Sequence, residues 1–306
     1  MTKSNRVASD RSDIGARLML LLLCCLWGVT WPIMRLALYQ IPPLSMRTTS
    51  VALGALTLYL VCLIKGRSFR LHNAKTVAHV VVASLLNVTS FSLFGSFAQL
   101  TAATSRVAIL AYTMPIWSVV MAWLFLGERP SRLEAFSVGL CATGLTILIY
   151  PLTAAGVPIG ILLALATGVS WAAGTVYVKW ARIDADPMGV ASWQVTIAFL
   201  TLVPCLLVSE GGLHLGSADA RALAATAFTG IFASGIAYGL WFAIIQRLPA
   251  MTASLGVLGS PVIGIFASMA ILGERPTVAD FVGFALIFGA SACVLLAHRA
   301  PAEPTP

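Results

Sequence analysis

Charged residues are scarce in this chain of 306 residues. Only 10% of them are Asp, Glu, Lys or Arg, whereas 59% are apolar. A soluble domain carries about 25% charged residues, so the composition indicates a protein that lies in a membrane. The longest polar stretch between apolar runs covers residues 209–220, which leaves no room for a soluble catalytic domain.

Carboxylates are missing from the middle of the apolar runs. The acidic residues that flank these runs all lie in predicted loops or at helix ends: Glu128, Glu134, Glu210, Asp219, Glu274 and Asp280. A proton relay or a sodium site usually includes an acidic group within the membrane. The coupling mechanism therefore stays open, and a carrier that moves its substrate down the substrate's own gradient fits best.

Motifs for metal, disulfide or covalent chemistry are also absent. The six cysteines lie in apolar runs with no Cys-x-x-Cys spacing and no neighbouring His, so we interpret them as packing residues. The apolar runs hold no Gly-x-Ser-x-Gly, no His-Glu-x-x-His and no acidic pair. We therefore expect no cofactor, no metal and no enzymatic activity.

What the chain does contain is a series of ten apolar runs. A membrane-spanning helix needs about 20 mostly apolar residues, and short loops with Pro, Gly or charge separate the runs. They cover residues 18–38, 45–64, 76–99, 105–126, 133–150, 157–180, 189–208, 221–246, 251–272 and 279–297. The sequence thus predicts an all-α membrane protein with ten transmembrane helices. Residues 1–17 form a polar N-terminal tail without a clear cleavage site, and residues 299–306 form a Pro-rich tail that we expect to be disordered.

The positive charge follows the predicted topology. With the N-terminus inside, 14 of the 19 Lys and Arg residues fall on the inner side, and Arg47 is among the few on the outer side. Inner loops of membrane proteins are enriched in Lys and Arg, so both termini are expected to be cytoplasmic. The excess of positive charge is then a topology signal, and we expect no nucleic-acid partner.

One stretch occurs twice, 146 residues apart. Gly127-Glu128-Arg129-Pro130 and Gly273-Glu274-Arg275-Pro276 each end an apolar run that contains a proline, Pro115 or Pro261. Each turn is followed by a capping box, which opens the next helix. The duplication predicts a first five-helix repeat over 18–150 and a second over 151–298. Because five is odd, the second repeat enters the membrane from the opposite side, as in many secondary transporters.

These features resemble the drug/metabolite transporter superfamily, in particular its EamA-type branch. The shared features are ten helices in two halves, a Trp in the first helix of each half (Trp27 and Trp171), and a proline before each Gly-Glu-Arg turn. Within that branch the chain is most similar to the bacterial exporters of aromatic amino acids. The resemblance implies a central cavity between the halves and export across the inner membrane, with no catalytic residues. Residues 18–38 lack the Glu that small multidrug relatives use, which disfavours drug–proton exchange by that mechanism.

Aromatic residues divide by their predicted depth in the membrane. Trp31, Trp123, Trp180 and Trp193 lie near the ends of apolar runs, so we interpret them as interfacial anchors. Trp27 and Trp171 lie too deep for that role, and each indole N–H there needs an acceptor. They are predicted to line a wet cavity, and packing in the core is the alternative.

Polar and aromatic residues recur at helical spacing in the third and eighth runs. Such a stripe usually faces the interior of the bundle, although it also serves to join helices. Each internal proline removes one backbone hydrogen bond, which predicts a helix bend at Pro115 and at Pro261. Together these arguments predict a substrate site formed by Trp27, Asn87, Ser90, Phe94, Tyr112, Trp171 and Tyr238.

The sequence therefore predicts an inner-membrane secondary transporter that exports aromatic or large apolar amino acids by alternating access. It works in the lipid bilayer as a monomer or homodimer. Other small metabolites or quaternary amines remain alternative substrates, and a channel, a sensor or an intramembrane enzyme remain alternative functions. A nucleotide-sugar carrier would need cationic groups in its spans, and this chain has almost none there.

Overall fold

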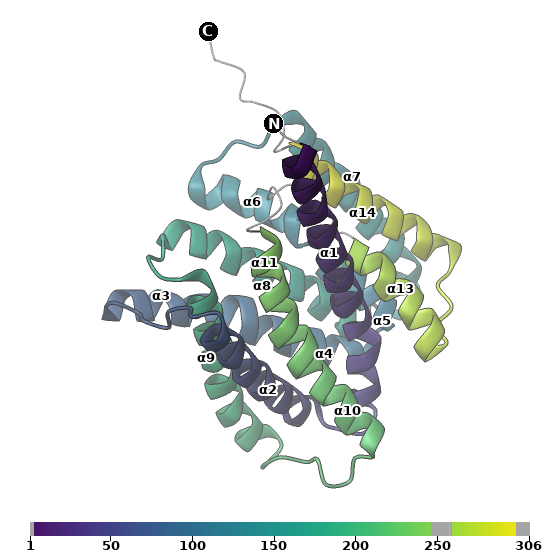
Figure 1. Ribbon diagram of the computed structural model, residues 1–306. Coiled ribbons are helices and arrows are strands. Elements are labelled where there is room, and N and C mark those ends of the chain that lie inside the picture. The colour runs from purple at the N-terminus through teal and green to yellow at the C-terminus, as the bar shows by residue number, and fades with distance from the viewer. Residues whose placement is uncertain (1–2, 246–256, 258, 298–306) are drawn as a thin grey trace.

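The computed structural model describes residues 3–245, 257 and 259–297, and every regular element in these ranges is helical (Figure 1). The first half contains α1 (Lys3–Leu38), α2 (Pro43–Ile64), α3 (Ala74–Ser84), the π-helix η1 (Leu85–Ser90), α4 (Phe91–Thr101), α5 (Thr104–Ala111), α6 (Met114–Leu126) and α7 (Arg132–Ile149). The second contains the 3₁₀ turn η2 (Tyr150–Ala155), α8 (Ile159–Ala181), α9 (Pro187–Ser209), α10 (Ala220–Phe228), the π-helix η3 (Thr229–Ile236), α11 (Ala237–Ile245), α13 (Gly259–Leu272) and α14 (Val278–Ala297).

The predicted all-α architecture is confirmed. Within the described ranges, eight helical stretches are long and apolar enough to cross a membrane, and two shorter apolar helices cover Gly259–Leu272 and Val278–Cys293. The predicted tail 1–17 is, from Lys3 onward, the polar first part of α1. Residues 251–256 and 258 of the ninth predicted run, and the predicted tail 299–306, lie outside the described residues.

The repeated turn has the same geometry in both halves. Gly127 ends α6 and Gly273 follows α13, each with φ of 69°, a left-handed conformation that glycine adopts without steric cost. The capping boxes that follow are both formed. Ser131 and Glu134 bond each other's backbone N–H at 3.3 and 2.7 Å, and Thr277 and Asp280 do so at 3.2 and 2.8 Å. The predicted helix–turn–helix unit is therefore present twice.

A π-helix interrupts the third span of each half. η1 continues α3 into α4, and η3 continues α10 into α11, so the two π-helices occupy matching positions of the repeat. A π-turn holds one residue more than an α-turn and is frequent at functional sites. Each one rotates the residues that follow it by about 100° relative to an uninterrupted α-helix.

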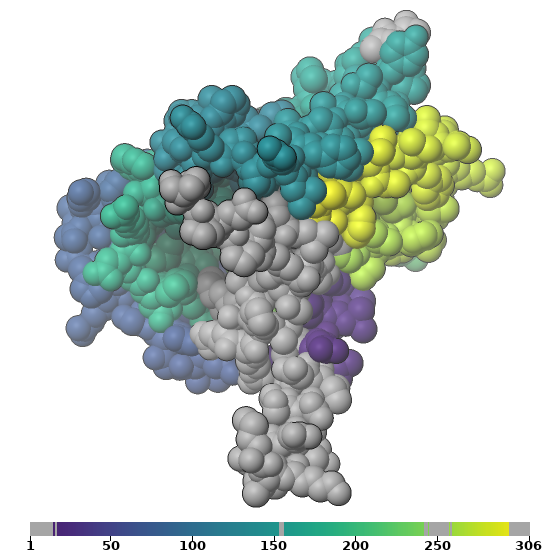
Figure 2. All heavy atoms as spheres, turned by 90° about the horizontal axis from the view of Figure 1, so that it is seen from above, coloured from purple at the N-terminus to yellow at the C-terminus, as the bar shows by residue number. Residues whose placement is uncertain are grey.

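The fifth helices of the two halves pack against each other at one edge of the molecule. Figure 2 shows the yellow α13 and α14 beside the teal α7 when the protein is seen from above. Gly144 and Gly283 let α7 and α14 approach closely, because a Cβ at Gly144 would lie 3.0 Å from the Gly283 carbonyl oxygen. This contact joins the two halves at that edge.

Carboxylates from the second half cap helices of the first half. Glu210, at the end of α9, accepts hydrogen bonds from the backbone N–H groups of Leu44 and Ser45 at the start of α2, both at 2.9 Å. Glu274, in the repeated turn, does the same for the first two residues of α5. A negative charge is favourable at a helix N-terminus, so these two residues join the halves.

The inverted orientation of the two turns is testable by labelling. We expect a single cysteine at Arg129 to react with an impermeant maleimide only from the cytoplasmic side, and a cysteine at Arg275 only from the opposite side, on a background without native cysteines. The reason is that five spans separate the matching points of the two repeats. Labelling of both positions from the same side would contradict the inverted repeat.

Candidate substrate cavity

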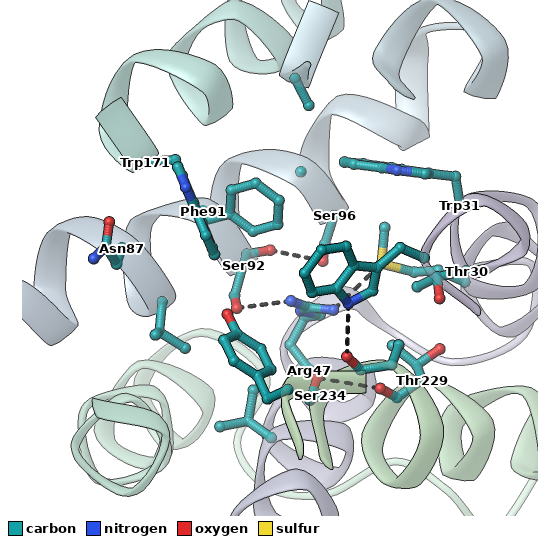
Figure 3. Close-up of a pocket in the computed structure, with 18 of the residues that line it drawn as sticks. Thr30, Trp31, Arg47, Asn87, Phe91, Ser92, Ser96, Trp171, Thr229 and Ser234 are labelled. Atoms are coloured by element: carbon teal, nitrogen blue, oxygen red, sulfur yellow. Dashed lines mark hydrogen bonds between the residues drawn. The ribbon is translucent and has the colours of Figure 1, made fainter. Parts of the chain in front are cut away.

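A cavity of about 150 Å³ lies where the two halves meet (Figure 3). It is lined by residues of the first four spans of the first half, and by residues of α8, α9, η3 and α11 together with Val257 from the second half. Among the described residues, neither α7 nor α14 contributes to its wall. The cavity is thus an interface between the repeats, which is where secondary transporters with repeated halves bind substrate.

Two aromatic pairs cross this interface. Trp27 of α1 packs edge-on against Tyr238 of α11, with ring centroids 6.2 Å apart. Trp171 of α8 packs edge-on against Phe91 of α4, at 5.1 Å. Each pair joins the first span of one half to the third span of the other, so the two pairs are related by the internal repeat. All four rings belong to the cavity wall.

The indole N–H of Trp27 has the acceptor that its depth requires. It donates a hydrogen bond of 3.2 Å to the carbonyl oxygen of Ala233 in η3. The π-turn also lets the Ser234 hydroxyl donate to the carbonyl oxygen of Thr229, five residues earlier, at 3.2 Å. The widened turn therefore supplies polar groups to the cavity from a membrane-spanning segment.

The third span presents a different set of residues to the cavity than the predicted stripe. Asn87 lines the cavity as expected, but Ser90 and Phe94 are not among the lining residues. Phe91, which belonged to the predicted stripe, lines the cavity together with Ser92 and Ser96. The prediction placed Ser84, Asn87, Phe91 and Phe94 on one face of a continuous α-helix with Ser90 beside them, whereas across the wide turn at η1 the lining positions follow 87, 91 and 95.

Tyr112 lies at an interruption of the fourth span. α5 ends at Ala111 and α6 begins at Met114, so the predicted bend at Pro115 is a break between two helices. Tyr112 is 8% exposed and lines the cavity beside this break. The carbonyl oxygen of Ala111 packs against α8, because a Cβ at Gly168 would lie 3.0 Å from it.

The matching proline of the second half can be described only in part. Pro261 is buried in the first turn of α13, at its third residue. Residues 246–256 and 258, which precede it, lie outside the described residues, so the bend predicted there stays a prediction.

Trp31 corrects the sequence-based division of the aromatic residues. It is only 6% exposed and belongs to the cavity wall, whereas it was expected to be an interfacial anchor. It follows Trp27 by one helical turn, so both side chains share a face of α1. Trp123 and Trp180 are 53% and 59% exposed, as expected for residues that contact lipid head groups.

Arg47 is a charged residue of the cavity wall that sequence reasoning also missed. It was counted with the outer loops, but it lies inside α2 and is 8% exposed. Its guanidinium donates to the Ser92 hydroxyl at 2.7 Å and to the sulfur of Met34 at 3.4 Å. One signal was available: Arg47 lies within an apolar run, four residues before Val51, which also lines the cavity. A charge in such a position is a candidate functional residue by default.

The arrangement suits binding of a small amphipathic molecule. Aromatic rings form much of the wall, and a guanidinium, an amide and several hydroxyl groups supply its polar positions. None of the described lining residues is acidic, and the described residues contain no cluster of three or more metal-binding side chains. Ligand pockets typically combine apolar walls with a few such polar groups.

Comparison with known proteins agrees with this architecture. A transporter of Bacillus subtilis named YvbV, described as uncharacterized, is 28% identical over 88% of both chains. A probable amino-acid metabolite efflux pump of Salmonella typhimurium is 24% identical over 87% of this chain and 90% of its own. The uncharacterized inner membrane transporter YedA of Escherichia coli is 22% identical over 91% of this chain and 90% of its own.

A solved crystal structure superposes on this fold with a TM-score of 0.64. Its sequence is 23% identical, and the match covers 93% of this chain and 98% of that one. This likeness concerns the fold alone.

A family-level match covers the two halves separately. Residues 15–150 and residues 158–296 each match the same family, as expected for a duplicated unit. The two segments together include almost all of the spans described above. The chain therefore belongs to the EamA-like transporter family and is a multi-pass membrane transporter, not an enzyme.

Proposed function

We propose that this protein exports amino acids with aromatic or large apolar side chains across the bacterial inner membrane. One observation carries the proposal: the cavity between the halves has aromatic walls from both repeats and a small set of polar groups. Aromatic side chains bind an aromatic ring through edge-to-face and offset contacts. The polar groups then meet the charged end of the same molecule.

The volume of the cavity supports a substrate of this size. An apolar cavity of about 150 Å³ in another protein holds a benzene ring, and the cavity here has about that volume. Its wall contains the two Trp–aromatic pairs that join the halves and, in Tyr112, a further ring next to the helix break. One aromatic side chain is therefore a fitting occupant.

The repeated halves and the relatives support the direction and place of transport. Rocking of two related halves around a central site gives alternating access. One relative bears the name of a probable amino-acid metabolite efflux pump, and another that of an inner membrane transporter. The absence of acidic residues from the described cavity wall favours a carrier that follows the substrate's own gradient.

A quaternary amine is the substrate that the same aromatic wall would otherwise favour, because aromatic rings attract such cations. Arg47 argues against it. A positive guanidinium in the same cavity repels a cationic ligand, and no described lining residue carries a negative charge. An amino acid has a carboxylate for this guanidinium.

The proposal predicts how single rings affect transport. Trp27→Ala and Tyr112→Ala are each expected to lower the initial rates for phenylalanine and tryptophan by about 2- to 10-fold, because one aromatic contact is lost. Alanine transport is expected to change little, since alanine has no ring to contact. Uptake into proteoliposomes, normalised to the amount of correctly folded protein, is the measurement. Saturable counterflow in the same vesicles distinguishes a carrier from a channel.

A matched control comes from the same half. Trp123→Ala removes an equally large ring from α6, but Trp123 is 53% exposed and does not line the cavity. It should leave all rates unchanged. Asn87→Leu should lower the rates for all three amino acids alike, because the amide meets the part of the substrate that they share. If Trp27→Ala and Tyr112→Ala both transport phenylalanine and tryptophan at the parental rates, the proposal of an aromatic substrate is wrong.

A further inference from the structure

Arg47 is a buried cation without an anionic partner in the described structure. Its side chain is 8% exposed, and the described ion pairs of the molecule join other residues: Arg67–Asp186, Arg106–Asp280 and Lys179–Glu128. Removing a charge from water is costly unless another charge or several hydrogen bonds compensate it. The fold therefore maintains a positive charge whose compensation is incomplete.

The hydrogen bonds of the guanidinium leave part of its donor capacity unused. A guanidinium has five N–H donors in a fixed planar fork. One terminal nitrogen donates to the Ser92 hydroxyl and the other approaches the Met34 sulfur, which is a weak acceptor. The buried Nε has no hydrogen-bond partner in the described part of the chain. A fork with free donors matches the two oxygens of a carboxylate.

The surroundings of Arg47 complete an anion site. Figure 3 shows the guanidinium beside Ser92, with Ser96 close by, in the cavity wall. The Ser92 hydroxyl oxygen accepts from Arg47, which leaves its own proton to point at a bound anion. No acidic side chain lines the cavity among the described residues, so nothing on the wall competes for the guanidinium.

The charge is on one side of an otherwise repeated cavity. α2 and α9 begin at matching prolines, Pro43 and Pro187, and the lining residues Val51 and Val195 correspond at the same shift. Arg47 then corresponds to Ala191. The two aromatic pairs that join the halves are related by the repeat, whereas among the described lining residues the cation comes from the first half only, so the cavity can orient a molecule that has one charged end.

We propose that Arg47, with Ser92, binds the carboxylate of the transported molecule and makes the protein selective for aromatic carboxylates. This inference rests on the proposed function, because both concern the same cavity, and it defines the substrate class more closely. A carboxylate is required for binding, whereas an ammonium group is tolerated. Neutral and cationic analogues of the same ring are excluded because they leave the buried charge uncompensated.

Four probes that each carry one phenyl ring test this selectivity for carboxylates. We expect counterflow in proteoliposomes with phenylalanine and with 3-phenylpropanoate, and values at least about tenfold lower with phenylalaninamide and 2-phenylethylamine. Arg47→Met should abolish this selectivity, because its apolar side chain leaves the carboxylate without a partner. Ser92→Ala keeps the cation and should lower the ratio of phenylalanine counterflow to phenylalaninamide counterflow about threefold or more. Ser92→Ala also serves as the test if the Arg47→Met protein fails to fold.

A control variant removes the same charge elsewhere. Arg35→Met, near the end of α1, loses a guanidinium that stacks on the Tyr39 ring at 5.0 Å and does not line the cavity. It should keep the parental ratio of acid to amide. A change in this ratio equal to that of Arg47→Met would mean that general surface charge, and not the cavity, sets the selectivity, and would overturn the inference.

The outcomes separate this inference from the proposed function. If phenylalanine and phenylalaninamide are carried equally well, the carboxylate site is wrong while amino-acid transport stands. If 3-phenylpropanoate is carried and phenylalanine is not, the carboxylate site stands and the proposed amino-acid substrate is wrong. Parental selectivity in folded Arg47→Met and Ser92→Ala proteins would overturn the inference, and a wild-type protein that carries none of the four probes would overturn both proposals.

Discussion

Gly230→Ala is expected to destabilise the protein strongly, although it adds a single methyl group. Gly230 lies in η3, where this π-helix crosses α2. A Cβ at this position would overlap the carbonyl oxygen of Ser50 and lie 2.8 Å from the Cβ of Leu53. Neither atom can rotate away as the end of a long side chain would, so the two helices must separate. Overpacking of this kind costs about 1 to 3 kcal/mol.

The same substitution is also expected to affect transport by the protein that still folds. Ser50 and Arg47 lie within one turn of α2, where the Ser50 hydroxyl donates to the Arg47 carbonyl oxygen at 3.1 Å, so we expect a displacement of α2 at Ser50 to move the Arg47 side chain as well. We expect a thermal midpoint several degrees lower in detergent, together with a reduced transport rate per folded molecule.

Gly139→Ala is the matched control for this prediction. Gly139 lies in α7, and a Cβ there would meet nothing within 4 Å. Because alanine is a better helix former than glycine, this variant should be as stable as the parent or more stable by up to about 1 kcal/mol. Equal midpoints for Gly230→Ala, Gly139→Ala and the parent would show that α2 and η3 are not held in the close contact described here.

The parts of the fold that follow local signals could be predicted from the sequence. Runs of about 20 apolar residues define the spans, and the Gly-Glu-Arg-Pro turns with their capping boxes mark where α7 and α14 begin. Each signal is contained in one continuous segment of the sequence, so no knowledge of the tertiary structure was needed. The duplication of the unit was predictable for the same reason, since it is a property of the sequence.

The orientation of side chains around the cavity could be predicted only in part. Five predicted residues line it as expected: Trp27, Trp171, Tyr112, Tyr238 and Asn87. The reason is that an indole N–H, a phenol or an amide far from the membrane surface needs a hydrogen-bond partner. Phe94 was selected by α-helical spacing and Ser90 as its neighbour on the stripe, and this spacing fails after a π-turn. The π-helix η3 packs closely against α2 at Gly230, and such a contact between segments far apart in the chain leaves no local pattern in the sequence.

Arg47 was assigned to the outer surface because its position near the end of an apolar run was taken as exposure to solvent. It lies near the start of α2, a position typical of a residue that extends to the membrane surface. The structure has its side chain directed inward instead, between Met34 of α1 and Ser92 of α4. The direction was set by those neighbouring helices, which are far from Arg47 in the sequence.

Glu274→Ala is expected to destabilise the protein much more than Glu128→Ala, although the two residues occupy the same position of the repeat. The carboxylate of Glu274 accepts hydrogen bonds from the backbone N–H groups of Thr104 and Ser105, which have no helical partner at the start of α5. Hydrogen bonds to a charged group stabilise a protein by about 1.5 to 3 kcal/mol. Glu128 is bonded instead to Lys179 at 2.6 Å, in a pair whose side chains are 49% and 62% exposed, and such exposed pairs contribute under about 1 kcal/mol.

The comparison of these two alanine variants tests whether the hydrogen bonds of Glu274 to α5 stabilise the contact between the two halves. We expect the thermal midpoint in detergent to fall several degrees for Glu274→Ala and to change little for Glu128→Ala, with Glu274→Gln between them because the amide keeps an acceptor oxygen but loses the charge. Repetition at high salt sharpens the test, since salt screens the exposed Glu128–Lys179 pair and has less effect on the partly buried bonds of Glu274. Equal losses in both alanine variants would mean that the turn stabilises each half locally, and that the contact between Glu274 and α5 does not hold the halves together.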